Sequence, residues 1–302
     1  MILVTGSAGF IGSNIVKRLC QNNKIISVDY IDPRERFSNI KVESHITPEE
    51  LISDLDRCIS LSSVVIHQGA NTCTTDHSVE MIEQNFGFTK KLIDKCLKYD
   101  KRIIYASSAA VYGLGNCGFN VSRECEHPLN IYGFSKLMVD DYVRSLFRLG
   151  LNTSQIVGMR YFNVYGPGEE FKGKMASTIF HFFNQSRSGS IKPFNGSDNF
   201  FRDFIYVKDL VAQVEHYIKN DSLSGIFNCG TGTERSFLDV AKIVSEITDS
   251  NIECIDFPES LAPYYQSFTK ADMNVTHALG VPPAKTSLES GIRDYIENYL
   301  SL

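Results

Sequence analysis

The sequence predicts an α/β fold in which a doubly wound parallel sheet carries a smaller, interleaved C-terminal domain. Short apolar runs alternate with segments of helical periodicity through the first half of the chain, which is the pattern of a parallel sheet covered by helices. A glycine-rich turn joins the first apolar run to the first helical segment. The second half has no repeat or linker that would separate an independent domain, so we expect two lobes that exchange segments.

Five apolar runs are expected to form the strands of the first half, because buried parallel strands are short and continuously apolar. They span residues 2–4, 25–28, 64–66, 103–105 and 156–161. Helices are expected at residues 10–20, 81–97 and 132–146. Another helix should begin at Thr47-Pro48-Glu49-Glu50, which supplies an N-cap, a proline at the first helical position and acids in the first turn.

The second half is less regular and begins after the Gly-Pro-Gly break at residues 166–168. Helices are expected at residues 174–184, 207–218, 236–247 and 288–299, with Ser236 as an N-cap. A strand at residues 225–229 should rejoin the first sheet. The larger domain is therefore expected to contain residues 1–162 and about 203–230, and the smaller domain residues 163–202 and about 231–302.

Composition and charge disfavour several classes of protein. The chain has 302 residues, and its net charge of −5 argues against a nucleic-acid binder. It contains no run near the roughly 20 apolar residues that span a bilayer, and its first residues lack signal-peptide features. The eight cysteines include no C-x-x-C pair, which disfavours a zinc or redox site. We therefore expect a cytoplasmic protein with no metal and no nucleic-acid or membrane partner.

The glycine-rich turn has the spacing of a dinucleotide site. Gly6, Gly9 and Gly12 would allow a tight turn, a close approach to a pyrophosphate and close packing of helix on strand. The N-terminus of the following helix offers free N–H groups to phosphates. Asp29 ends the second strand 17 residues after Gly12, close to the position of the ribose-binding acid of a Rossmann domain. A turn without a ligand is the alternative, and the strand and helix around it make that interpretation weak.

The same loop leaves the cofactor open. Asp29 would favour NAD by binding the ribose 2′-hydroxyl, whereas Arg34 and Arg36 would neutralise the 2′-phosphate of NADP. Ordinary solvated charge explains the two arginines equally well. We expect NADP, with NAD as the alternative.

Tyr132 and Lys136 lie four residues apart and therefore share one face of a helix. The ordinary pKa of tyrosine, near 10, is too high for a base at neutral pH, and a nearby ammonium and a cationic nicotinamide would both lower it. Ser108 follows an apolar strand, where it can align a reacting hydroxyl with Tyr132. The Y-x-x-x-K pattern is common by chance, but its combination with Ser108 and the N-terminal glycines indicates catalysis.

These motifs carry a resemblance to a known family. TGSAGFIG at residues 5–12, SSAAVYG at 107–113, the Y-x-x-x-K pattern and RYFNVYGP at 160–167 resemble extended short-chain dehydrogenases/reductases that act on nucleotide sugars. The resemblance spans nearly the whole chain and implies a Rossmann domain and self-association. Dehydratases of this group carry an Asp-Glu pair where this chain has Ala109 and Ala110, so a dehydratase is disfavoured.

Within that group the chain resembles the ADP-L-glycero-D-manno-heptose 6-epimerases, which make a lipopolysaccharide core precursor. The stretch KGKMAS at residues 172–177 is the most specific element of this resemblance. The resemblance implies transient oxidation at C6″ of ADP-D-glycero-D-manno-heptose, rotation of the aldehyde and re-reduction by tightly bound cofactor. Tyr132 and Lys172 would be the two bases. Without its context Lys172 is an exposed loop lysine, and it needs burial, or Lys174 or Arg202 as a cationic neighbour, to act near neutral pH.

The resemblance also implies contacts with both ligands, although each residue has an ordinary structural explanation when taken singly. The further cofactor contacts are Phe10, Ile11, Tyr30, Gln68, Gly69, Ala70, Asn71, Thr72, Asn85 and Val164. The substrate contacts are Asn163, Lys174, His181, Phe194, Asn195, Gly196, Ser197, Arg202 and Tyr265. Tyr30, Gln68, Lys174 and Asn195 depart from the family pattern, which leaves the nucleotide, the heptose and the cofactor open.

Two other functions compete with this hypothesis. A UDP-sugar 4-epimerase or a related nucleotide-sugar reductase would use Tyr132 without needing Lys172. A non-catalytic dinucleotide-binding regulator is disfavoured, because Ser108, Tyr132 and Lys136 are all present.

Overall fold

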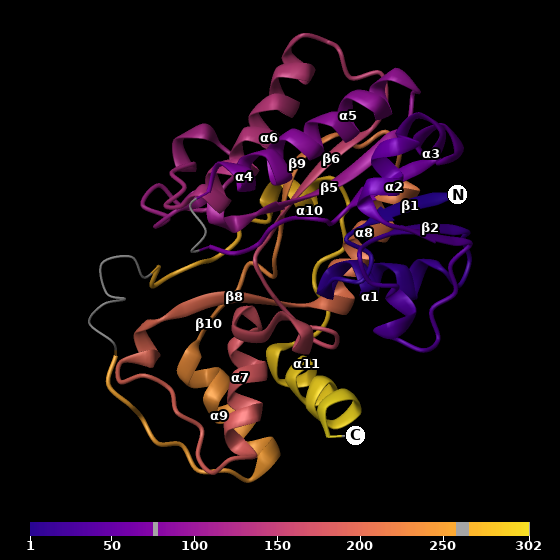
Figure 1. Cartoon of the computed structure of the whole chain (residues 1–302). Coiled ribbons are helices and arrows are strands. Elements are labelled where there is room, and N and C mark those ends of the chain that lie inside the picture. The colour runs from indigo at the N-terminus through magenta and orange to yellow at the C-terminus, as the bar shows by residue number, and fades with distance from the viewer. Residues whose placement is uncertain (75–77, 258–265, 302) are drawn as a thin grey trace.

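The computed structural model describes residues 1–74, 78–257 and 266–301. In this part of the chain seven strands form one parallel sheet in the order β3-β2-β1-β4-β5-β6-β9 (Figure 1). The strands are β1 (Ile2–Thr5), β2 (Ile25–Val28), β3 (Ser44–Ile46), β4 (Val64–His67), β5 (Arg102–Ser108), β6 (Ile156–Tyr161) and β9 (Gly225–Cys229). The order reverses between β1 and β4, and this reversal opens a crevice at the carboxyl ends of the strands. The predicted fold class is confirmed.

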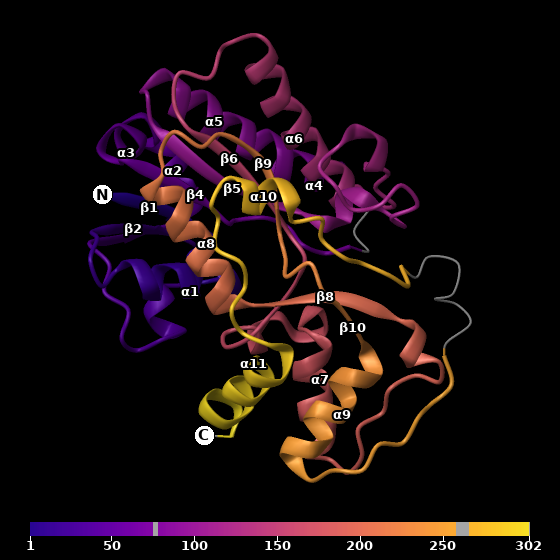
Figure 2. The same ribbon diagram turned by 180° about the vertical axis from the view of Figure 1, so that it is seen from behind.

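Helices cover both faces of this sheet, as the two opposite views show (Figures 1 and 2). Apolar residues of α1 and α8 pack on one face, and those of α2, α3, α5 and α6 pack on the other. These helices are α1 (Phe10–Leu19), α2 (Pro48–Ser53), α3 (Leu55–Leu61), α5 (Phe88–Lys98), α6 (Ile131–Arg148) and α8 (Val207–Lys219). The expected capping box at Thr47 and Glu50 begins α2. Because all seven strands are parallel, their carboxyl ends lie at the same edge of the sheet.

A smaller lobe lies below the first sheet in Figure 1. Its three-stranded sheet has the order β10-β8-β7, with β7 parallel and β10 antiparallel to β8. The helices α7, α9 and α11 enclose a second apolar core against it. The elements are β7 (Asn163–Tyr165), α7 (Thr178–Ser186), β8 (Phe201–Tyr206), β10 (Glu234–Ser236), α9 (Phe237–Thr248) and α11 (Leu288–Tyr295). Ser236 caps α9, as the sequence predicts.

The chain crosses between the lobes more often than expected. The strand β9 rejoins the first sheet beside β6, in agreement with the prediction. The helix α10 (Asn274–Ala278) also returns to the larger lobe, where the hydroxyl of Thr276 donates to the carbonyl of Asn228 and Val281 joins the core below α8. The expected boundaries are therefore wrong in two places, because β8 belongs to the smaller sheet and residues 274–281 pack with the larger lobe.

Two predicted helices differ from the structure. The helix expected at residues 174–184 begins at Thr178, because Gly173 has a φ of +55° and Ser177 supplies the N-cap. The helix expected at 81–97 is divided into α4 (Val79–Ile82) and α5 by a π-turn at Glu83–Gly87. None of the helices in the described ranges combines the length and apolarity needed to cross a bilayer.

Candidate active site

The glycine-rich turn after β1 is packed so tightly that it requires glycine. A Cβ on Gly12 would lie 1.9 Å from the carbonyl oxygen of Gly6, and a Cβ on Gly6 would lie 2.5 Å from the backbone nitrogen of Gly69. Phe10 and Ile11 open α1, where helix geometry leaves backbone N–H groups without intrahelical acceptors. The first turn of α1 has no acid and no side-chain cap. This end of the helix therefore fits the phosphates of a dinucleotide.

The end of β2 supplies the polar groups beside this turn. One oxygen of Asp29 accepts a hydrogen bond from the Ala8 N–H at 2.9 Å, and the other accepts from the Tyr30 N–H at 2.8 Å. Arg36 lies on the turn itself, donating from Nε to the Ala8 carbonyl at 3.0 Å. Arg34 is instead paired with a carboxylate, that of Asp32. Of the two arginines expected near a 2′-phosphate, only Arg36 contacts the glycine-rich turn.

The loop after β4 brings a second set of predicted cofactor contacts to the crevice. Tyr161 donates from its hydroxyl to Oε1 of Gln68 at 3.0 Å, and the buried Nε2 of Gln68 has no hydrogen-bond partner among the described residues. Such an unsatisfied buried donor fits a bound polar ligand. Ala70 and Asn71 are partly buried and Thr72 is exposed in the same loop. With Asp29, these residues fit a dinucleotide cofactor.

Asn85 was expected to touch the cofactor, and the structure gives it another role. Its side chain is completely buried in the π-turn. Its Oδ1 accepts from the Asn71 N–H at 2.8 Å, and its Nδ2 donates to the Asn71 carbonyl at 2.9 Å and to the Ser135 hydroxyl at 3.0 Å. Because both amide hydrogens are used, Asn85 holds the loop after β4 against α6, and its contact with the cofactor stays a prediction.

His67, which the sequence analysis did not single out, ties three elements together beneath the crevice. The Thr89 hydroxyl donates to the Asn85 carbonyl at 2.5 Å, so its oxygen accepts the proton of His67 Nε2 at 2.8 Å. Nδ1 of His67 then accepts from the Thr5 hydroxyl at 2.6 Å. Burial, together with the positive charge of Lys136, lowers the pKa of His67 to about 3. This histidine is therefore neutral, and it fixes Thr5 at the start of the glycine-rich turn.

The predicted catalytic residues come together at the carboxyl end of β5. Ser108 ends that strand and its hydroxyl accepts from the Ala110 N–H at 3.1 Å. Asn130 caps α6 by accepting from the Gly133 N–H, and a Cβ at Gly133 would lie 2.7 Å from the Ala110 carbonyl oxygen. This close approach brings the Tyr132 hydroxyl near that of Ser108. The structure therefore brings these two predicted residues together, and their catalytic roles stay predictions.

The electrostatics differ from the expectation that Lys136 lowers the pKa of Tyr132. Burial raises the pKa of Tyr132, and the Ser108 hydrogen bond opposes this only in part. The Lys136 ammonium lies 5.9 Å from the centre of the Tyr132 ring and donates to the Ala106 carbonyl at 2.9 Å. Burial also lowers the pKa of Lys136 to about 8, while Asp140 raises it. Ionisation of Tyr132 therefore requires positive charge beyond that of this lysine.

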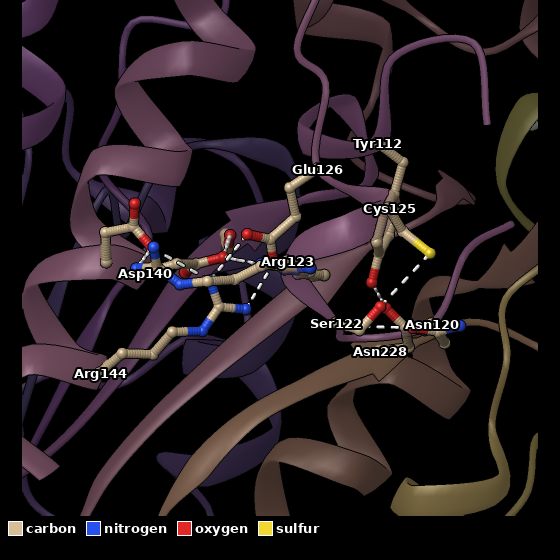
Figure 3. A network of polar contacts seen from close by, with 12 residues as sticks. Tyr112, Asn120, Ser122, Arg123, Cys125, Glu126, Asp140, Arg144 and Asn228 are labelled. Carbon is tan, nitrogen blue, oxygen red and sulfur yellow. Dashed lines mark hydrogen bonds and ion pairs between the residues drawn. The ribbon is translucent and has the colours of Figure 1, made fainter. Parts of the chain in front are cut away.

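Asp140 continues the helix face of Tyr132 and Lys136 by one more turn. It accepts hydrogen bonds from Tyr105 at 2.9 Å and Ser107 at 3.0 Å, and it forms a completely buried ion pair with Arg160 at 2.7 Å. Glu126 extends this network by pairing with both Arg160 and Arg144. Figure 3 shows Glu126, Asp140 and Arg144 in this network. The network ties β5, β6 and α6 together directly beneath the catalytic residues. Its signal in the sequence was the four-residue spacing from Lys136.

Lys172 lies on the loop between β7 and α7, over the cofactor-binding helix. Its ammonium is 5.5 Å from the centre of the Phe10 ring. The side chain of Lys172 is exposed, while desolvation by the neighbouring protein lowers the pKa of Lys172 and the carboxylate of Glu169 opposes this. Arg202 donates to the backbone carbonyls of Phe201 and Gln266. Desolvation is what lowers the pKa of Lys172, and neither Lys174 nor Arg202 contributes to this shift as the expected cationic neighbour.

The predicted substrate residues are spread over the smaller lobe. Asn163 is exposed at the start of β7, and Val164 packs between the two cores. His181 shares a hydrogen bond of 3.3 Å with the Lys174 carbonyl. The other predicted contacts lie before and within β8. Phe194 packs on Phe257, the side chain of Asn195 donates a hydrogen bond to Asp256, and the guanidinium of Arg202 lies over the Phe237 ring. Between them, Gly196 has a left-handed backbone conformation and Ser197 is buried. Tyr265 lies outside the described residues. The binding roles of these residues stay predictions.

Comparisons with known proteins agree with this geometry. Residues 2–230 match the model of the NAD dependent epimerase/dehydratase family. An ADP-L-glycero-D-manno-heptose-6-epimerase of Brachyspira hyodysenteriae is 43% identical over 311 residues, which cover 98% of this chain and 97% of that protein.

Solved structures with the same fold include two epimerases. The ADP-L-glycero-D-manno-heptose-6-epimerase of Helicobacter pylori matches with a TM-score of 0.84 and 30% identity, over 100% of this chain and 96% of that one. The UDP-glucose 4-epimerase of Thermotoga maritima, solved with UDP-glucose, matches with a TM-score of 0.80 and 27% identity, over 98% and 97%. The chain therefore belongs to the NAD dependent epimerase/dehydratase family.

Proposed function

We propose that this member of the NAD dependent epimerase/dehydratase family converts ADP-D-glycero-D-manno-heptose to its L-glycero epimer at C6″. The observation that carries the proposal is the position of Lys172, which reaches over the cofactor-binding helix from the smaller lobe in a chain that also pairs Tyr132 with Ser108. Inversion of configuration at one carbon needs an acid–base group on each side of that carbon. The similarity to the 6-epimerases supports the choice of heptose.

The first half of the reaction uses Tyr132. Its phenolate would remove the proton of the C6″ hydroxyl, which Ser108 aligns by hydrogen bonding. When bound, the oxidised nicotinamide accepts a hydride from the sugar carbon and later returns it. Tyr132 would ionise more readily beside that cationic ring, because a nearby positive charge lowers the pKa of a phenol. Lys136 uses one of its three hydrogens on the Ala106 carbonyl, which leaves two for the cofactor ribose.

The second half of the reaction uses Lys172. Rotation of the aldehyde about its exocyclic bond moves the oxygen away from Tyr132, so another group has to protonate it. Because desolvation by the neighbouring protein lowers the pKa of Lys172, its ammonium is a stronger acid than an ordinary lysine. In the reverse direction the same group, once neutral, accepts the proton.

We expect NADP as the cofactor, with NAD as the alternative. Arg36 supports NADP, because it lies on the glycine-rich turn and a carboxylate neutralises Arg34. Asp29 supports NAD, because its carboxylate can accept from a ribose 2′-hydroxyl. Arg36→Ala should weaken NADP more than NAD if the 2′-phosphate lies here. A cytoplasmic location and self-association stay predictions.

The proposal is tested by proton NMR of ADP-D-glycero-D-manno-heptose after incubation with purified enzyme and no added cofactor. Appearance of the L-glycero epimer is the expected result, and Tyr132→Phe serves as the inactive control. If nothing changes when NAD or NADP is supplied, the heptose assignment is wrong. Conversion of UDP-glucose under the same conditions would then identify a 4-epimerase.

A further inference from the structure

A completely buried carboxylate lies at the base of the loop that carries Lys172. Glu169 Oε1 accepts from the Gly166 N–H at 3.2 Å and from the Ser177 hydroxyl at 2.8 Å, and its Oε2 accepts from the Ser177 N–H at 2.6 Å. Within the described ranges no basic side chain forms an ion pair with it. Gly166 and Ser177 are the two ends of the loop. One side chain therefore closes the loop, and its charge is compensated by hydrogen bonds from both ends of the loop and by the attraction of the Lys172 ammonium.

The closed loop is docked on the cofactor-binding helix. Asn14, in α1, donates from Nδ2 to the Pro167 carbonyl at 2.7 Å. The guanidinium of Arg36 stacks over the Phe171 ring, with 3.7 Å between its central carbon and the ring centre. Both contacts come from residues beside the glycine-rich turn. The loop that carries Lys172 is therefore held in a fixed position relative to the site expected to bind the cofactor.

Lys172 depends on this closure for its place. Its backbone N–H donates to the Glu169 carbonyl at 2.9 Å, and Gly173 then reverses the chain with a positive φ. A charged side chain on an exposed loop would otherwise sample many rotamers. We propose that Glu169 is a positioning residue, which closes loop 166–177 so that Lys172 is held as the second acid–base group. This inference rests on the proposed function.

The isosteric change Glu169→Gln makes the two ends of the carboxylate chemically different. An amide keeps one acceptor and turns the other oxygen into a donor. That donor would face either the Gly166 N–H or the Ser177 N–H, and two donors facing each other release one end of the loop. The side-chain volume stays nearly constant, so the effect should be confined to the loop.

The test uses the two epimers separately in single-turnover reactions of the whole enzyme, with the absorbance of the reduced nicotinamide as the readout. Oxidation of each epimer needs the base on its own side of the carbon. Lys172→Ala and Glu169→Gln should therefore slow oxidation of one epimer by about 100-fold and spare the other. A residue with a merely structural role would slow both epimers alike.

Asp203→Asn is the matched control. Asp203, in β8, is also completely buried and also accepts backbone N–H groups, those of Thr231, Gly232 and Ala271, which lie far from the loop that carries Lys172 in the sequence. This variant should lose stability and slow the two epimers equally. Comparing it with Glu169→Gln distinguishes the general effect of losing a buried carboxylate from the specific effect of displacing Lys172.

The outcomes distinguish the inference from the function. If the natural enzyme interconverts the epimers and Lys172→Ala is selective, equal rates for both epimers in Glu169→Gln overturn the positioning role alone. If the natural enzyme leaves both epimers unchanged, the proposed function itself fails. Should Glu169→Gln not fold, Glu169→Asp keeps the charge and shortens the reach. In Glu169→Asp, the amide hydrogens of residues 166–177 should exchange with solvent faster than in the natural protein, and the oxidation of only one epimer should be slowed. Unchanged amide exchange together with equal oxidation rates for the two epimers would overturn the inference.

Discussion

Acid should destabilise this protein through His67. Burial lowers the pKa of His67 from 6.5 to about 3, so the unfolded state takes up the proton first as pH falls. The contribution of His67 to stability is therefore complete above pH 6.5 and is lost progressively as pH falls toward 3. Each unit in that window corresponds to about 1.4 kcal/mol. Lowering the pH from 7.5 to 5 should cost about 2 kcal/mol through this residue alone.

Urea unfolding of the natural protein and of His67→Gln at both pH values isolates this effect. Glutamine can accept from Thr5 and donate to Thr89 as the histidine does, but it does not titrate. Carboxylates titrate in both proteins and cancel in the difference. The natural protein should lose about 2 kcal/mol more than the variant between pH 7.5 and pH 5. Equal losses in the two proteins would refute the reasoning.

Three further changes test the site from other directions. Gly12→Ala places a Cβ 1.9 Å from the Gly6 carbonyl oxygen, so the purified variant should carry little or no bound nucleotide, measured by absorbance after heat release. Asp140→Asn removes one partner of the buried Arg160 ion pair and should lower the free energy of unfolding in urea by about 3–5 kcal/mol. Lys136→Met removes a buried ammonium, so the free energy of unfolding in urea should be at least as large as in the natural protein. Turnover should fall by about 100-fold or more, which is the usual contribution of acid–base catalysis. A loss of stability in Lys136→Met would contradict the last expectation.

The fold was predictable because its signals are local. The strand at Ile25–Val28 and the caps at Thr47 and Ser236 stand where the sequence places them. Apolar runs and capping residues act on their immediate neighbours, and so they are visible in the sequence. The spacing from Tyr132 to Lys136 is local in the same sense, since one helix carries both residues.

The residues that the sequence did not explain depend on contacts that only the folded chain makes. Asn85 carries the motif position of a cofactor contact, and the π-turn also directs its side chain toward Asn71 and Ser135. Glu169 gives no signal, because its donors are two backbone N–H groups and one hydroxyl that the folded loop brings around it. The return of residues 274–281 to the larger lobe was missed for the same reason.

The interleaving of the lobes has a chemical use in the proposed reaction. Tyr132 stands on the larger lobe and Lys172 on the smaller one, and a single carbon has to meet both. Only Phe162 separates β6 from β7, so the larger sheet passes almost directly into the smaller. Asn14 then binds the loop of Lys172 to the helix of the cofactor site. The distance between the two acid–base groups is therefore set through the cofactor-binding helix, and a flexible linker between separate domains could not maintain it.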